Sequence, residues 1–122
     1  MRKICLIVDD SSIVRMVARK ILESLDFTVA EAENGETALA KVLDLKPDVV
    51  LLDCNMPVKS GLEFLEELRR RSDIDQPAVV FCTTENDAVD IETALRGGAN
   101  EYILKPYDRG ILAGKFRQIG LL

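Results

Sequence analysis

The sequence contains no histidine among its 122 residues. Histidine is the usual general base near neutral pH, so its absence excludes Ser-His and Cys-His nucleophile pairs and the histidine ligands common in zinc sites. The three cysteines, Cys5, Cys54 and Cys82, are odd in number and form no Cys-x-x-Cys pair. They predict reduced thiols. Any chemistry must therefore depend on carboxylates, hydroxyls and lysine.

Long apolar stretches are also missing. The longest uninterrupted runs, such as 49–52 and 78–82, fall far short of the roughly 20 residues that a membrane helix needs. The run at 4–8 follows two basic residues, but two aspartates stop it before it could serve as a secretory signal. We therefore expect no membrane insertion and a cytoplasmic location.

Positive charge is in deficit, because 16 lysines and arginines face 21 aspartates and glutamates, for a net charge of −5. Broad binding to nucleic acid phosphates needs clustered lysine and arginine, so direct nucleic-acid binding is disfavoured. The hydrophobic fraction of 48% supplies a core for one domain and excludes intrinsic disorder. We expect a single domain over residues 1–122, with any output module on another molecule.

Five short apolar runs of strand length recur along the chain, separated by segments with the apolar spacing of helices. Two of the runs are continuous, which is typical of strands covered on both faces of a parallel sheet. Repeated strand–helix units predict an α/β fold: a doubly wound, flavodoxin-like domain whose five-stranded parallel sheet carries helices on both faces. The last helix is the least favoured, because glycines interrupt it. The five runs are 4–8, 28–32, 49–52, 78–82 and 102–104.

Polar side chains stand where the predicted strands end: Asp9 and Asp10 after the first, Asp53 after the third, Thr83 after the fourth and Lys105 after the fifth. Singly, each fits a helix cap, a turn or a surface loop. The central strands of a parallel sheet, however, bring their carboxyl ends to one edge, where ligand sites lie. Three carboxylates there need a cation, and oxygen donors suit Mg²⁺. Thr83 and Lys105 are suited to holding phosphoryl oxygens, and Asp53 is the candidate nucleophile.

At these positions the sequence resembles the receiver domains of two-component response regulators, especially the stand-alone chemotaxis type. Identity, order and spacing match along the whole chain, in Ile7-Val8-Asp9-Asp10, Asp53 with Met56-Pro57 and Gly61, Thr83, and Lys105-Pro106. The resemblance implies that Asp53 accepts a phosphoryl group from a phosphohistidine on a histidine kinase or histidine phosphotransfer protein. It implies Mg²⁺ bound by Asp10, Asp53 and the backbone carbonyl of Asn55, with Asp9 acting mainly through water.

The same resemblance implies a switch. Lys105 would contact the phosphoryl oxygens, Thr83 would turn its hydroxyl toward them, and Tyr102 would follow inward. A face formed by the fourth helix, fifth strand and fifth helix would then meet a downstream protein. Asn55 and Glu85 lie at positions that tune phosphoryl lifetime in the family, and their identities predict a short-lived phosphoryl state.

A few positions depart from the family pattern or carry a second interpretation. Thr84 replaces the alanine or glycine of many relatives, which is expected to narrow the opening beside the acceptor, and Tyr107 replaces a common phenylalanine. By resemblance, the peptide bond before Pro106 is expected to be cis. Cys54 and Cys82 flank the acceptor and the threonine, so a redox sensor is an alternative, but we favour small packed side chains.

Two other functions stay open beside the signalling switch, which would not be an enzyme acting on an external substrate. A Mg²⁺-dependent phosphatase of the haloacid-dehalogenase-like type also uses an aspartyl nucleophile, but it needs an acid two residues later, where this chain has Asn55. A receiver cut from a transcription factor would have lost its DNA-binding module.

Overall fold

Strands and helices alternate throughout the computed structural model, which describes residues 2–54, 60–83 and 88–122. The strands form one parallel sheet in the order β2-β1-β3-β4-β5, which confirms the predicted α/β class. Within the described residues, no helix is both long and apolar enough to cross a bilayer. The elements are β1 Ile4–Val8, α1 Ser12–Ser24, β2 Thr28–Ala32, α2 Gly35–Leu45, β3 Val49–Asp53, α3 Gly61–Arg70, β4 Ala78–Thr83, α4 Ala88–Arg96, β5 Glu101–Leu104 and α5 Arg109–Gln118.

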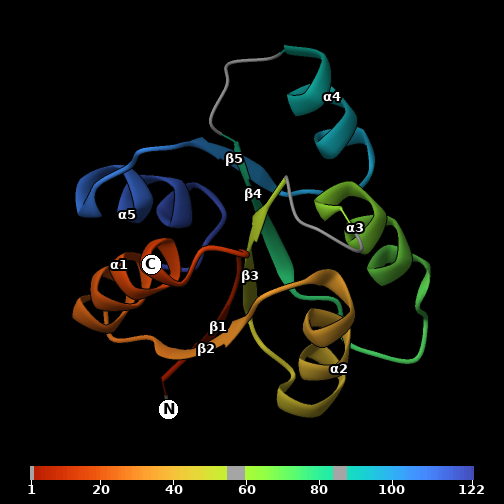
Figure 1. Ribbon diagram of the computed structural model, residues 1–122, viewed down its shortest axis with the longest axis horizontal. Coiled ribbons are helices and arrows are strands. Elements are labelled where there is room, and N and C mark those ends of the chain that lie inside the picture. Colours follow the sequence, from red (N-terminus) through yellow and green to blue (C-terminus); the bar gives the residue numbers. More distant parts are fainter. Residues whose placement is uncertain (1, 55–59, 84–87) are drawn as a thin grey trace.

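Helices cover both faces of the sheet, α1 and α5 on one side and α2, α3 and α4 on the other (Figure 1). Each side has its own apolar cluster, and every residue of β3 is buried. Phe27 and Phe116 meet edge to face, with ring centroids 5.3 Å apart, in the cluster under α1 and α5. The interior strands β1, β3 and β4 are therefore packed on both faces, and their carboxyl ends lie along one edge of the sheet.

Two central strands run one residue further than the apolar pattern predicts. Asp53 belongs to β3 because it pairs with Cys82, and Thr83 belongs to β4 because it pairs with Leu104. Polarity ends the hydrophobic run, but the ladder of backbone hydrogen bonds continues through these residues. Both side chains are consequently held by strand geometry.

The glycine-containing segment at the C-terminal end does form a helix, α5. Asp108 caps it by accepting a hydrogen bond from the Ile111 amide at 2.8 Å. Leu112 and Phe116 are fully buried against the sheet. Apolar burial and the cap therefore outweigh the low helix propensity of glycine.

Two arginines of α1 hold a glutamate on the edge strand β2. Arg15 Nε lies 2.9 Å from Glu31 Oε1, and Arg19 Nε lies 2.7 Å from Glu31 Oε2. The bond from Arg19 lowers the pKa of Glu31 below its usual 4.5, burial opposes this change, and Arg15 adds to the lowering. The ionised form of Glu31 is thus favoured in the folded protein.

A Glu31→Gln variant should lose this contribution in a pH-dependent way. Because the folded pKa lies below the unfolded one, the stabilisation is complete above pH 4.5 and is lost as pH falls through the folded value. We expect a loss of about 0.5 kcal/mol near neutral pH, since the pair is partly solvent-screened. Urea unfolding of the wild-type and Glu31→Gln proteins at neutral and acidic pH measures this loss. If the difference in unfolding free energy is the same at both pH values, the ionised Glu31 carboxylate is not its source.

Candidate functional site

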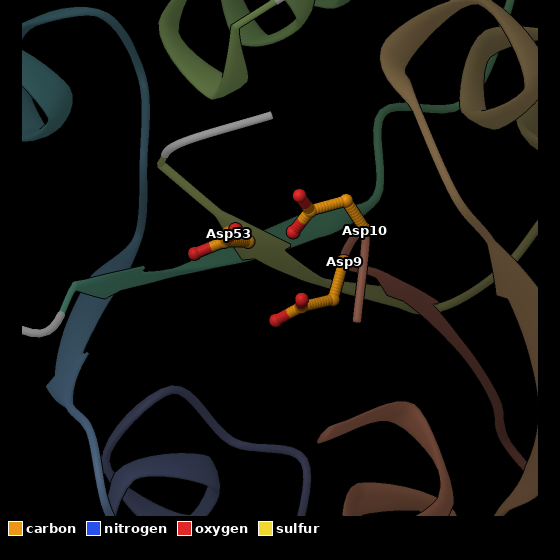
Figure 2. A group of neighbouring side chains, drawn as sticks. All are labelled: Asp9, Asp10 and Asp53. Atoms are coloured by element: carbon orange, nitrogen blue, oxygen red, sulfur yellow. The ribbon is translucent and has the colours of Figure 1, made fainter. Parts of the chain in front are cut away.

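Three aspartates come together at the carboxyl edge of the sheet (Figure 2). Asp9 and Asp10 directly follow β1, and Asp53 ends β3, which pairs with β1. Each offers a carboxylate oxygen, and these oxygens lie within 4.8 Å of one another. Asp9 and Asp53 are buried, whereas Asp10 is exposed. The structure therefore brings together the acids that the strand pattern singled out.

Lys105 pairs with two of these acids from the end of β5. Its Nζ lies 2.6 Å from Asp9 Oδ2 and 2.9 Å from Asp53 Oδ1. Its backbone amide donates to the Thr83 carbonyl at 2.8 Å. Burial alone would lower the pKa of Lys105, but the two carboxylates raise it to about 12. Lys105 therefore stays protonated and offsets part of the negative charge.

The charge balance of the pocket favours a further cation. Burial raises the pKa of Asp53 above its usual value, Lys105 opposes the rise, and Asp9 and Asp10 add to it. Among the residues that the structure describes, one lysine pairs with this group of three carboxylates, so their combined negative charge would exceed the positive charge of that lysine. Oxygen donors of this kind suit Mg²⁺, which takes carboxylates and water and shares itself with phosphate. The donor set therefore fits the expected ion.

Hydrogen bonds hold both the carboxylate and the backbone of Asp9 in place. Its Oδ1 accepts from the Ser11 amide at 2.9 Å, and its amide donates to the Ala32 carbonyl at 3.1 Å. Arg15 donates to the Asp9 carbonyl at 2.6 Å. Sequence reasoning did not single out Arg15, because this contact depends on how α1 leaves β1. Ser11, and not Asp9, is the residue that caps α1.

Thr83 ends β4, the strand next to the one that carries Asp53, and Tyr102 lies on the edge strand β5. Thr83 is buried, and its side chain forms a hydrogen bond with the Cys54 thiol. Tyr102 is half-buried and pairs with Phe81 in the register of the two strands. The sequence already placed Cys54 next to the acceptor candidate, and the structure adds its interaction with the Thr83 side chain.

The cysteines resemble packed side chains more than reactive thiols. Cys5 and Cys82 are buried, and burial raises the pKa of both thiols. Burial also raises the pKa of the partly exposed Cys54, although its bond with Thr83 opposes the rise. A raised pKa disfavours the nucleophilic thiolate, so burial of the thiols favours the packing interpretation over the redox one.

Gly61 shows why the sequence motif requires glycine at the start of α3. A Cβ there would lie 2.3 Å from the backbone oxygen of Asp53 and 3.0 Å from the Cα of Cys54. The Gly61 amide donates to the Cys54 carbonyl at 3.3 Å. The missing side chain lets α3 approach the end of the strand that carries the acceptor candidate.

Some expectations for the site fall on residues that the structure does not describe. Asn55 and Glu85, the expected metal ligand and lifetime-tuning positions, lie outside the described ranges, as do Thr84 and the Met56-Pro57 pair. The Lys105–Pro106 bond is cis, as the resemblance predicts. The roles of Asn55 and Glu85 stay predictions.

Comparison with known proteins gives concordant results. The family model for the response regulator receiver domain matches residues 5–117. A chemotaxis protein CheY1 from Helicobacter pylori is 36% identical over 117 residues, which cover 93% of this chain and 94% of that protein. The solved structure of Vibrio cholerae chemotaxis protein CheY4 superposes with a TM-score of 0.91 at 28% identity, covering 98% of this chain and 99% of the other.

A second kind of relative is matched only in part. A protein-glutamate methylesterase/protein-glutamine glutaminase from Trichodesmium erythraeum is 41% identical over 108 residues, which cover 86% of this chain. That stretch spans 30% of the relative's length. The similarity thus concerns one segment of a longer protein and not that protein as a whole.

Proposed function

Because this chain belongs to the response regulator receiver domain family, we propose that it accepts a phosphoryl group on Asp53 from a phosphohistidine of a histidine kinase or histidine phosphotransfer protein. One observation carries the proposal. The buried Asp53 carboxylate is bound by Lys105 and lies within 4.8 Å of the carboxylates of Asp9 and Asp10. We take residues 1–122 as a single receiver domain.

The transfer needs a nucleophile, a charge-stabilising group and an exit for the leaving group. A carboxylate oxygen of Asp53 attacks phosphorus, an O–P bond forms, and the N–P bond of the donor breaks. The imidazole nitrogen leaves with the electron pair and takes a proton from solvent. Lys105, already 2.9 Å from Asp53 Oδ1, would bind a phosphoryl oxygen and stabilise the transferring charge. Hydrolysis by water then returns the carboxylate and inorganic phosphate.

The carboxylates of Asp10 and Asp53, with the backbone carbonyl of Asn55, would hold Mg²⁺, and Asp9 would contribute mainly through water. When bound, Mg²⁺ neutralises charge on the carboxylates and on the phosphoryl oxygens. Asp9 has a second task that needs no ion, because its Oδ2 fixes the ammonium group of Lys105 at 2.6 Å. The lysine is thereby pre-positioned beside the acceptor.

Phosphorylation of Asp53 would change the surface formed by α4, β5 and α5. The phosphoryl group offers Thr83 a new hydrogen-bond acceptor, Tyr102 moves inward, and the face of α4, β5 and α5 changes its affinity for a downstream protein. Such a switch acts by binding in the cytoplasm and turns over no external substrate. Asn55 and Glu85 would keep the phosphoryl lifetime short.

Incubation with acetyl phosphate tests the proposal. With Mg²⁺, we expect intact-protein mass spectrometry to show one acid-labile phosphoryl group per chain. Without Mg²⁺, incorporation should fall by at least about tenfold, because the carboxylates then repel the incoming phosphate. An Asp44→Asn variant, altered at an exposed aspartate of α2, should behave as the wild-type protein.

Two outcomes would overturn the proposal. Absence of any label in the presence of Mg²⁺ would remove Asp53 as an acceptor. Release of many phosphates per chain from an added phosphomonoester would instead indicate a phosphatase of the haloacid-dehalogenase-like type.

A further inference from the structure

Tyr102 lies on β5, an edge strand that, over residues 2–54, 60–83 and 88–122, has β4 as its one neighbour in the sheet. Successive residues of a strand point to opposite faces. Tyr102 packs against the cluster under α2, α3 and α4, whereas Ile103 belongs to the cluster under α1 and α5. Glu101 therefore shares the α5 side with Ile103, and Tyr102 the opposite side.

A lysine of α5 reaches around this sheet edge. Lys115 Nζ lies 4.3 Å from the centroid of the Tyr102 ring and 3.5 Å from Glu101 Oε1. The side chains of Lys115 and Glu101 are only 23% and 20% exposed. A cation over an aromatic face is attracted by the ring quadrupole, and partial burial limits competition from water.

Glu101 has a second bond that holds it in place. Its Oε1 accepts from the Tyr102 amide at 2.9 Å, so one carboxylate oxygen contacts both the backbone of Tyr102 and the ammonium group above its ring. Edge strands leave backbone amides without a ladder partner, and this glutamate supplies one. Glu101, Lys115 and Tyr102 thus form one connected unit, which we call the edge clamp.

We propose that Lys115, held by Glu101, is a positioning residue that keeps the Tyr102 ring in its present half-buried position until phosphorylation moves it. This inference rests on the proposed function, because it concerns the same switch. Inward movement of the ring must break the contact with Lys115. The clamp therefore sets how much of the protein is switched before any phosphoryl group arrives, and how strongly activation is resisted.

A Lys115→Met variant tests the clamp, because methionine keeps an unbranched apolar side chain and removes the charge. We expect Lys115→Met to bind beryllofluoride with Mg²⁺ about two- to fivefold more tightly than the wild-type protein, measured as an apparent dissociation constant. This range follows from the strength typical of exposed to half-buried cation–π pairs. Lys115→Arg keeps a cation over the ring and should stay near the wild-type value. Glu101→Gln keeps an acceptor for the amide, weakens the hold on Lys115, and should fall between them.

The tyrosine ring itself gives a readout that a merely structural role would not move. The chain has two tyrosines, so NMR of ring-labelled protein yields few signals, and a Tyr107→Phe variant assigns them. The wild-type protein without and with beryllofluoride supplies the two end positions. Without the activator, Lys115→Met should shift the Tyr102 signals toward the activated position. Lys20→Met, which removes an exposed lysine of α1, should not.

The possible results separate the clamp from the switch. If the wild-type protein responds to beryllofluoride and Lys115→Met matches it in both affinity and ring signals, the clamp is wrong while the switch stands. If Lys115→Arg changes as much as Lys115→Met, the cation–π contact is not the cause, and the clamp is again wrong. If the wild-type protein does not respond at all, the proposed function fails, and the clamp fails with it.

Discussion

An Asp53→Asn variant should take up no measurable phosphoryl group from acetyl phosphate and Mg²⁺, a loss of at least about a thousandfold in rate. The amide oxygen of asparagine is a far weaker nucleophile than a carboxylate, and the neighbouring acids serve other contacts. Asp9 is bound to Lys105 and to the Ser11 amide, and Asp10 is exposed. Intact-protein mass spectrometry measures the loss.

The same variant should become more stable in Mg²⁺-free buffer. Burial raises the folded-state pKa of Asp53, so its ionised form costs stability at every pH above that value, and asparagine removes the cost. Loss of the bond to Lys105 offsets part of the gain, so we expect a small rise in melting temperature.

Incorporation of label by Asp53→Asn at the wild-type rate would show that another residue is the acceptor.

A Gly61→Ala variant should lose roughly 2–4 kcal/mol of unfolding free energy and most of its phosphoryl uptake. The new Cβ would meet the backbone of Asp53 and Cys54, with the nearest atom at 2.3 Å. Backbone atoms at the end of a buried strand cannot move aside as a flexible side chain can. Either α3 withdraws from the sheet or the end of β3 shifts, and a shift of β3 displaces Asp53, the proposed acceptor.

Gly114→Ala is the matched control, because it makes the same chemical change at a site where, among the described residues and apart from the adjacent helix backbone, no heavy atom lies within 4 Å of the new Cβ. Gly114 lies inside α5, where alanine has the higher helix propensity. We expect this variant to gain up to about 1 kcal/mol. Urea unfolding measures both variants, and equal stability of Gly61→Ala and the wild-type protein would refute the steric explanation.

Much of the architecture follows from local pattern. Continuous apolar runs such as Val49–Leu52 locate the buried strands, and helical spacing between them dictates parallel connections. The pattern fails at strand ends, where Asp53 and Thr83 are polar yet belong to the ladder. It also undervalues α5, because the burial of Phe116 cannot be read from propensity.

The sequence predicted those parts of the candidate site that the ends of the parallel strands bring together. Ends of adjacent parallel strands must meet, so the approach of Asp53 to Asp9 follows from the strand order. Contacts made by helices were not predictable in this way. Arg15 reaches the Asp9 carbonyl and Lys115 reaches the Tyr102 ring through the placement of α1 and α5, and no residue spacing encodes those placements.

The strand order also places Asp53 and Tyr102 in different parts of the sheet. Asp53 belongs to β3, which has a hydrogen-bonded strand on each side, whereas Tyr102 belongs to β5, which pairs only with β4 in the part of the chain that the structure describes. A reacting group profits from an immobile support, because small displacements of a nucleophile are costly in rate. A side chain that must move, such as the Tyr102 ring in the proposed switch, moves more easily where it has fewer contacts to break. In the proposed switch, the reacting group would thus lie on an interior strand and the moving ring at the edge of the sheet, where a partner protein can contact it.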